Sequence, residues 1–268
     1  MRGEEDMSQL HIYIDGSWLY KSGGPGRVLS SQTENPNQGV RIDFSRFDEL
    51  LLRYVQQKNP QCIALGERYI VTSLFTLPPD FDSWSDEYST ILPDHLEQTK
   101  RGITAREHFV NAALSAGYSD KAIYRPIIRS WIVEKLIQKQ YHEKQVDATV
   151  VALLVRSAII YSKDFHCVVT GDADILPAIK VAYPEYTENV FIATTHPDEL
   201  KAEHRQAAFS LNNFEFKIPP VYLQDYVKDF IQGDQVYSCA NCKKVFVRLK
   251  PIPSSSRPYC SVCLPKRT

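Results

Sequence analysis

The sequence lacks any long apolar run: no part of its 268 residues approaches the roughly 18–20 consecutive apolar residues needed to cross a bilayer. Residues 1–10 carry Glu4, Glu5 and Asp6 and no apolar stretch, unlike a signal peptide. Net charge is also nearly absent, at −1. An aromatic content of 11% argues against disorder, because a disordered chain lacks the apolar surface that offsets conformational entropy. We therefore expect a folded cytoplasmic protein with no membrane partner.

The small net charge hides an asymmetry between the body and the C-terminal end. Residues 239–268 contain seven Lys or Arg and no acid, whereas the remaining 238 residues hold 24 basic and 32 acidic side chains. Within the basic end, residues 243–250 (KKVFVRLK) alternate basic with apolar side chains, which predicts a strand with one basic face. This pattern favours contact with a polyanion, with nucleic acid as the expected partner.

The six cysteines divide in the same way. Cys62 and Cys167 stand alone among apolar neighbours and are expected to be buried and unreactive. The other four form two C-x-x-C pairs separated by seventeen residues, which is typical of a four-thiolate zinc site: Cys239, Cys242, Cys260 and Cys263. Two disulfides are the alternative, but a cytoplasmic chain would keep them reduced. Structural Zn²⁺ would supply folding free energy that so short a segment cannot obtain from burial.

Apolar runs alternate with helical periodicity along the rest of the chain. We expect strands at 10–14, 67–75, 123–128, 166–170, 190–194 and 213–218. We expect helices beginning after Asp43 and at 106–116, 131–144, 146–161, 175–182 and 199–210. Residues 22–39 are expected to form a loop, and residues 76–100, which are rich in Pro and Asp, a surface insertion with a short helix near Leu96. Near-continuous apolar strands alternating with helices predict an α/β domain whose mainly parallel sheet is covered on both faces.

Carboxylates follow two of the predicted strands. Asp15 follows the first strand, and Asp172 and Asp174 follow the strand at 166–170 through Gly171. Active sites of parallel α/β sheets lie at these carboxyl ends. One Asp suffices to cap the next helix, so the second Asp and Asp15 call for another cause. A divalent cation would offset the repulsion among them, and hard oxygen ligands suit Mg²⁺ or Mn²⁺.

A further acid, Asp147, opens the helix predicted at 146–161. On its own, an Asp at a helix N-terminus is more often a partner of the helix dipole than a metal ligand.

Three motifs in order carry a family resemblance: IDGS at 14–17, EKQVD at 143–147 and TGDAD at 170–174. Together they resemble the NYN domain family, a branch of the PIN-like ribonuclease fold. The resemblance implies a Rossmann-like, three-layer α/β/α nuclease domain over residues 8–218, which a linker (219–236) would join to a zinc ribbon (237–268).

The resemblance also implies a chemistry. Four aspartates would hold Mg²⁺ or Mn²⁺ and hydrolyse RNA phosphodiester bonds: Asp15, Asp147, Asp172 and Asp174. Ser17 would supply a hydroxyl near them, and Trp18 would stack on a base of single-stranded or structured RNA. Lys144 is the leading candidate for a phosphate contact, with further candidates at Lys139, Lys135, Arg129 and Arg125. The zinc ribbon would assist nucleic-acid binding.

The sequence departs from the family in two places, and these departures define the alternatives. Trp18 stands where members commonly have Asn, and residues 150–154 lack the acid that members often carry in this helix. A catalytically weak or inactive nucleic-acid-binding or scaffold protein is therefore the second hypothesis. A third, a phosphatase-like or nucleotide enzyme that uses Asp15 as nucleophile on another Rossmann-like fold, is disfavoured because Ser17 replaces the acid expected two residues on. A homo-oligomer or a protein partner on the ribbon stays open.

Overall fold

The computed structural model describes residues 8–138, 145–196 and 215–264. The expected helix at 199–210, the start of the strand expected at 213–218, and Lys139 and Lys144 lie outside the described residues.

A six-stranded parallel sheet forms the centre of the protein, with the strand order β3-β2-β1-β4-β5-β6. The strands are β1 (Ser8–Asp15), β2 (Cys62–Ser73), β3 (Ile123–Tyr124), β4 (Phe165–Val169), β5 (Val190–Thr194) and β6 (Val221–Tyr222). Helices cover the sheet on both sides, so the predicted α/β class with a central parallel sheet is confirmed.

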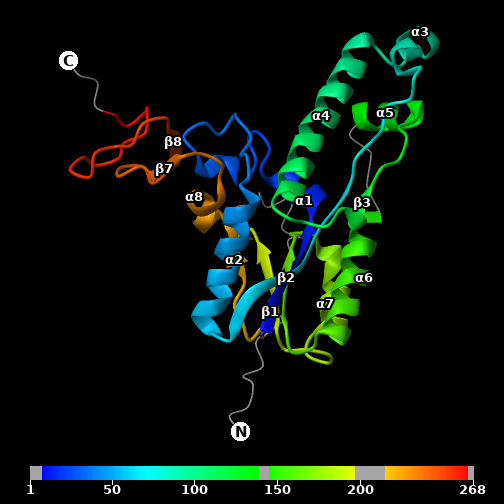
Figure 1. Ribbon diagram of the computed structural model, residues 1–268. Helices are drawn as coiled ribbons and strands as arrows, with labels where there is room; N and C mark the ends of the chain where they lie inside the picture. The colour runs from blue at the N-terminus through cyan, green and yellow to red at the C-terminus, as the bar shows by residue number, and fades with distance from the viewer. Residues whose placement is uncertain (1–7, 139–144, 197–214, 265–268) are drawn as a thin grey trace.

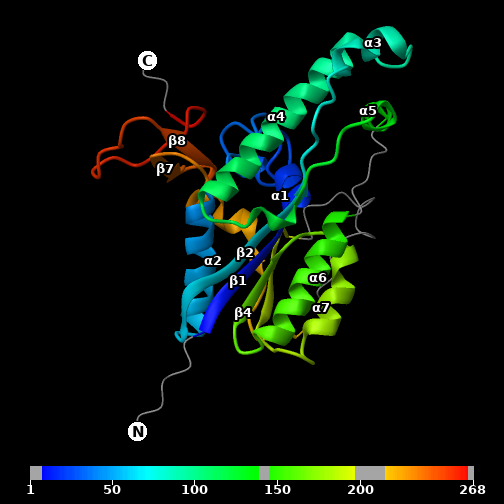
Figure 2. The same ribbon diagram turned by 45° about the vertical axis from the view of Figure 1, so that its right-hand side comes forward.

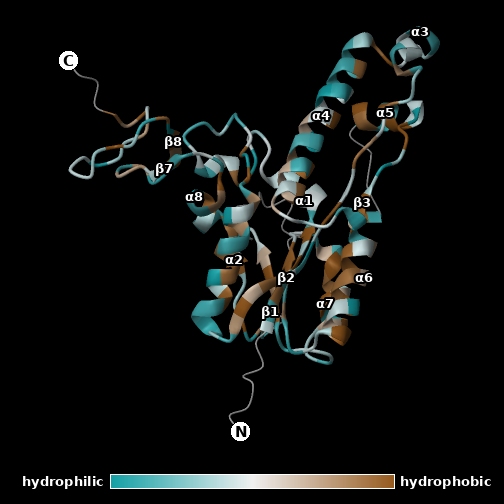
Figure 3. Cartoon of the chain, viewed as in Figure 1, coloured by the Kyte–Doolittle hydropathy of each residue, from teal (hydrophilic) through white to brown (hydrophobic). Residues whose placement is uncertain are grey.

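Alternating side chains along the strands build one hydrophobic core on each face of the sheet. Leu10, Ile12 and Ile14 of β1 belong to the core beneath α2 (Phe44–Lys58) and α8 (Val227–Phe230). Tyr13 points the other way, into the core beneath α6 (Gln145–Ile160) and α7 (Leu176–Ala182). This alternation is the two-residue period of an extended strand. Figure 1 shows the two helical layers, and the hydropathy colouring of Figure 3 shows apolar residues in the strands and in α6 and α7.

The first core helix, α2, begins where the sequence indicates. Asp43 is its N-cap, and the side chain of Asp43 accepts a hydrogen bond from the Arg46 backbone N–H. Phe47, Leu51 and Val55 recur at helical spacing and are fully buried against the sheet. Short 3-10 turns lie at η1 (Ser30–Gln32), η2 (Phe81–Ser83), η3 (Asp120–Ala122), η4 (Ala173–Ile175) and η7 (Leu223–Tyr226).

A helical extension projects beyond the carboxyl edge of the sheet (Figures 1 and 2). It consists of η2, α3 (Trp84–Glu87), the upper half of α4 (Pro93–Ser115) and α5 (Ser130–Ile137), and it has its own apolar cluster around Trp84, Leu96 and Ile132. The helix expected near Leu96 is present, but it is not short: α4 runs without a break from Pro93 and includes the helix expected at 106–116. A proline at the first helical position starts a helix, because its missing N–H needs no partner there.

The segment expected to link two domains packs on the sheet instead. Residues 215–218, predicted as the end of a strand, form none, and the sixth strand is β6, which follows Pro219 and Pro220. Leu223, Val227 and Phe230 are buried in the same core as β1. Much of the expected linker at 219–236 is thus part of the α/β body. Among the described helices, none has both the length and the apolarity to span a membrane.

The C-terminal ribbon is a two-stranded antiparallel hairpin of β7 (Gln235–Ser238) and β8 (Val245–Arg248), followed by an irregular segment. It is docked on the body through the loop at residues 23–42. The Glu34 backbone N–H donates to the Val245 carbonyl at 2.8 Å, and the Ser261 backbone N–H donates to Glu34 Oε2 at 2.8 Å. Val245 itself belongs to the main core, so the ribbon is fixed against the body.

Two buried histidines cross-link β1 and β4. His11 Nδ1 accepts from the Glu67 backbone N–H, which leaves Nε2–H to donate to Asp164. His166 Nδ1 lies 3.2 Å from the Tyr13 hydroxyl and its Nε2 lies 3.0 Å from the Tyr161 carbonyl. Because burial disfavours the charged ring, the pKa of His166 is lowered to about 4. The His166 ring is therefore a neutral structural group at pH 7.

Candidate functional site

The strand order places a topological switch point between β1 and β4. From β1 the chain builds outward through β2 and β3 on one side and through β4, β5 and β6 on the other. Ligands of such sheets bind in the crevice outside the carboxyl ends of the two strands at the switch point. Asp15 ends β1, and the run 170–174 directly follows β4. Two of the three motifs singled out in the sequence therefore meet at this edge.

Asp15 is a buried carboxylate with a raised pKa. Its side chain is only 3% exposed and caps α1 (Gly16–Ser22): Oδ1 accepts from the Trp18 backbone N–H at 2.9 Å, and Oδ2 accepts from Thr170 Oγ1 at 3.2 Å. Burial, with smaller contributions from the charges of Asp147 and Asp172, raises the pKa of Asp15 to about 6 against these two hydrogen bonds. The carboxylates of Asp147 and Asp172 are thus near enough to repel that of Asp15.

Asp172 and Asp174 lie at the start of η4, as the motif indicates. Asp172 Oδ1 accepts from the Asp174 backbone N–H at 3.0 Å, so Asp172 is the helix cap. The Asp172 backbone N–H donates to Thr170 Oγ1 at 3.0 Å, and the same hydroxyl donates to Asp15. Thr170 therefore ties the two strand ends together. Asp172 already caps this helix, and the Asp174 side chain is exposed to solvent.

Asp147 lies in the first turn of α6 and is half-buried. The charge of Asp147 is the largest of those that raise the pKa of Asp15, which places this last residue of the middle motif near the same edge. On the other side of this helix start, Tyr124 at the end of β3 is hydrogen-bonded to Thr149 Oγ1. Arg125 follows Tyr124 and is exposed.

Sequence reasoning missed a cation at the edge. Arg106 of α4 donates from Nη2 to the hydroxyl of Ser17, which is buried and also lies 3.5 Å from Thr72 Oγ1. The Arg106 guanidinium lies over the ring of Tyr20, 5.6 Å from its centroid. Arg106 is 89 residues from Ser17 in the chain, so no local pattern links the two.

Trp18 has a packing role at the site. A Cβ placed on Gly171 would lie 2.4 Å from Trp18 Nε1, so the indole rests directly on the Gly171 backbone and only glycine fits beneath it. Trp18 is half-buried and packs against the main core. The ring therefore covers the chain between Thr170 and Asp172 and keeps part of its surface exposed at the edge.

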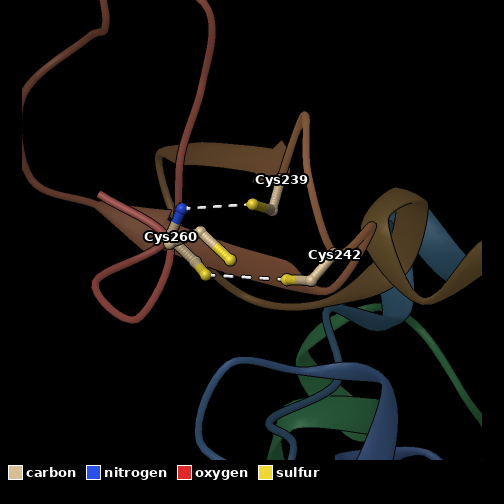
Figure 4. A group of neighbouring side chains, drawn as sticks. Cys239, Cys242 and Cys260 are labelled. Atoms are coloured by element: carbon tan, nitrogen blue, oxygen red, sulfur yellow. Dashed lines mark hydrogen bonds between the residues drawn. The ribbon is translucent and has the colours of Figure 1, made fainter. Parts of the chain in front are cut away.

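The four cysteines of the ribbon form a potential metal site. Their sulfur atoms all lie within 4.8 Å of one another, and Cys242 Sγ lies 3.6 Å from Cys260 Sγ. A disulfide needs about 2 Å, whereas four sulfurs around one Zn²⁺ at about 2.3 Å stand roughly 3.8 Å apart. In Figure 4 the side chains of Cys239, Cys242 and Cys260 point toward a common centre. The group can hold a metal ion.

Hydrogen bonds shift the pKa values of two of these thiols in opposite directions. Burial alone would raise the pKa of Cys239, but N–H groups of Cys260, Cys242 and Asn241 lower it to about 6. For Cys242 the Lys244 backbone N–H lowers the pKa, but burial and hydrogen bonds with the other three thiols raise it to about 11. The Cys260 N–H lies 3.5 Å from Cys239 Sγ, and Asn241 Nδ2 lies 3.5 Å from Cys263 Sγ. Such donors favour thiolate, the form that binds metal. Cys62 and Cys167, by contrast, are fully buried as predicted, and burial raises the pKa of both thiols.

Within the described residues, the cysteines are the group that brings three or more potential ligands together; the aspartates of the sheet edge do not form such a group. The proximity of these aspartates is indicated instead by the raised pKa of Asp15, to which the charges of Asp147 and Asp172 contribute.

The basic face expected on the ribbon strand is not formed. In β8, Val245 and Phe246 are buried, Val247 is exposed, and the one basic residue, Arg248, lies 3.6 Å from Glu34. The exposed cations of the ribbon lie outside the strand: Lys243, Lys244, Lys250 and Arg257. Of the other candidate phosphate contacts, Arg125, Arg129 and Lys135 are exposed.

Comparison of the chain with protein-family models, with curated proteins and with solved structures finds no match. The NYN resemblance stays a prediction, and function has to be argued from the site itself.

Proposed function

We propose that the protein is a metal-dependent ribonuclease of the NYN type whose active site is the edge formed by Asp15, Asp147, Asp172 and Asp174. The observation that carries this proposal is the buried Asp15 at the switch point, where the charges of Asp147 and Asp172 raise its pKa. Carboxylates that lie near a buried carboxylate repel it and lower the stability of the folded protein. A cation that binds there offsets the repulsion.

The donor set fits Mg²⁺ or Mn²⁺, because carboxylate oxygens are the ligands these hard ions prefer. Asp15, Asp172 and Asp147 would hold the ion, and Asp15 retains lone pairs beyond the two hydrogen bonds that it accepts. A bound ion would supply charge for the scissile phosphate and a water of lowered pKa.

The chain's own residues provide the remaining functions. Asp174, which is exposed beside the edge, is placed to accept a proton from an attacking water. Arg106 brings a guanidinium next to Ser17, where it would bind a phosphate of the substrate. The exposed part of Trp18 offers a surface for stacking on an RNA base. Lys144 belongs to the same proposal as a phosphate contact.

We propose further that the four cysteines hold one structural Zn²⁺. Support comes from four thiols that stand close together without a disulfide. This assignment agrees with a reducing, cytoplasmic environment.

A nucleic-acid-binding or scaffold protein without catalysis is the second candidate. Two observations favour it: the described aspartates do not form a compact ligand group, and Trp18 occupies space against Gly171 where the family commonly carries a polar amide. In this case RNA would bind at the same edge and remain intact.

The test is cleavage of end-labelled single-stranded RNA by zinc-loaded protein with and without added Mn²⁺. We expect cleavage that requires Mn²⁺ and that falls by at least about 100-fold in Asp172→Asn, since the loss of one ligand or proton acceptor typically costs a factor of 10²–10⁴. Asp225→Asn, an exposed aspartate on η7, is the matched control and should cleave normally. RNA that binds but stays intact would favour the second candidate.

A further inference from the structure

A large open groove lies beside the candidate active site, between the body and the ribbon. Its cavity volume is about 1400 Å³. The loop at 23–42 and the end of α1 form one wall, α4 forms another, and β8 of the ribbon closes it with Val245, Phe246 and Val247. None of the motifs read from the sequence pointed to this groove, because its walls come from four separated segments.

The groove is lined by cations that have no acidic partner. Lys21, Arg27 and Arg41 line it, and all three side chains are exposed. Within the part of the chain that the structure describes, none of the three forms an ion pair with a carboxylate. The one acid in the lining, Glu34, is engaged by Arg248 and by the Ser261 N–H. The groove thus presents positive charge on a body that is acidic as a whole.

Aromatic rings line the same groove. Tyr20, His108 and Phe109 line the groove, and Tyr20 packs edge-on against Phe109 with ring centroids 5.4 Å apart. A groove that offers both exposed cations and aromatic rings suits a single nucleic-acid strand, since cations bind its phosphates and rings stack on its bases.

The groove and the carboxylate edge share two helices, α1 and α4. Asp15 caps the start of α1, and Lys21 lies near its end, about 9 Å further along the helix axis at 1.5 Å per residue. On α4, Arg106 reaches Ser17 at the site, while His108 and Phe109 line the groove within the next turn. Hydrogen bonds also hold the loop wall in shape: Gly26 N–H to the Pro36 carbonyl and Val40 N–H to the Gly23 carbonyl, each at 2.7 Å.

We propose that this groove holds the single-stranded RNA that leads into the carboxylate edge, with phosphates bound by Lys21, Arg27 and Arg41. The proposal rests on the proposed nuclease function for what happens at the edge. In this proposal β8 of the ribbon forms one wall of the groove, and the basic side chains of the ribbon outside β8 are not the main contacts to the RNA.

Binding of a labelled single-stranded RNA to zinc-loaded protein without Mn²⁺ tests the groove. The test variant removes its three cations together: Lys21→Ala, Arg27→Ala and Arg41→Ala. A matched control removes three exposed cations of α2 and α7: Arg53→Ala, Lys58→Ala and Lys180→Ala. Both variants change the net charge equally and alter exposed side chains only, so both are expected to fold.

The expected effect follows from counterion release. Each phosphate contact on a single strand contributes about 0.7 to the slope of log K against log salt, so three contacts contribute about 2. If the variant and the wild type bind RNA equally well at 1 M salt, the loss of these three contacts weakens binding at 0.15 M salt by about 50-fold. The control should stay within a few-fold of the wild type. Equal binding by the test variant and the control, or no RNA binding by the wild type, would overturn the proposal.

The groove and the nuclease can fail separately. If binding depends on the groove but the wild type leaves RNA intact in Mn²⁺, the nuclease assignment fails and the groove stands. If the wild type cleaves RNA and the triple variant binds and cleaves as well as the control, the groove fails and the nuclease stands. Deleting residues 237–268 is a poorer test, because Val245 belongs to the main core.

Discussion

Replacing Asp15 by Asn should stabilise the protein at neutral pH. The pKa of Asp15 is raised from 3.8 to about 6, first by burial and then by the charges of Asp147 and Asp172. The folded protein therefore binds this proton more tightly than the unfolded chain does. Below about pH 4 the carboxyl is protonated in both states and costs nothing; as the pH rises through 6, the folded state loses stability.

The magnitude follows from the shift. About 2 pKa units at 1.36 kcal/mol each give roughly 3 kcal/mol of folding free energy lost at pH 7. Asn carries no charge and keeps an oxygen for the Trp18 N–H, but its amide nitrogen replaces the oxygen that accepts from Thr170, a loss of about 1 kcal/mol. Asp15→Asn should therefore be about 2 kcal/mol more stable than the wild type at pH 7 and should lose this advantage at pH 4.

Urea unfolding between pH 4 and pH 8, with zinc-loaded protein and no other divalent ion, measures this difference. Asp43→Asn, which changes the N-cap of α2, is the control and should leave stability nearly unchanged, since Asn and Asp cap about equally well. A difference between Asp15→Asn and the wild type that does not vary with pH would refute the reasoning. Added Mn²⁺ should narrow the gap, because an ion that binds the folded wild type stabilises only that protein.

Three further predictions follow from single positions. Gly171→Ala should cost about 1–3 kcal/mol in urea unfolding, because its Cβ would collide with Trp18, whereas Gly102→Ala on α4 meets no atom within 4 Å and should gain up to about 1 kcal/mol. In Cys242→Ser, metal analysis should find less than one zinc per chain, and hydrogen exchange should show β7 and β8 opened. Burial lowers the pKa of His166 to about 4. As the pH falls from about 6.5 to 4, the unfolded chain therefore binds a proton at His166 that the folded protein does not bind, and the wild type should lose stability. His166→Gln should lose less stability over the same pH range.

Much of the sheet could be predicted from the sequence because buried parallel strands are nearly continuous apolar runs. The run at 190–194 became β5, and Asp43 started α2. The two prominent failures involve proline. Pro93 lies in the segment expected to be an insertion but begins α4, and Pro219 and Pro220 start the expected linker although β6 of the central sheet follows them. Proline constrains its own φ and the residue before it, and it does not say whether an element ends or begins there.

The candidate site also has features that local sequence predicts and features that depend on tertiary packing. Asp15 and Asp172 could be placed at one edge because carboxyl ends of parallel strands meet there. Arg106 and the groove could not be found, since they depend on how α4 packs against α1, and contacts between residues 89 apart leave no local pattern. The ribbon's cysteines were predictable from spacing alone. Its docking through Glu34 depended on tertiary packing.

The claim on which the account depends is that the aspartates at the switch point together bind a divalent cation. Counting Mn²⁺ bound to zinc-loaded protein by electron paramagnetic resonance tests it most directly, because the method sees the ion and not the reaction. The account predicts at least one Mn²⁺ per chain in the wild type and none at the same Mn²⁺ concentration in the double variant Asp15→Asn, Asp172→Asn. Equal binding by the two proteins, or no binding by the wild type, would contradict it.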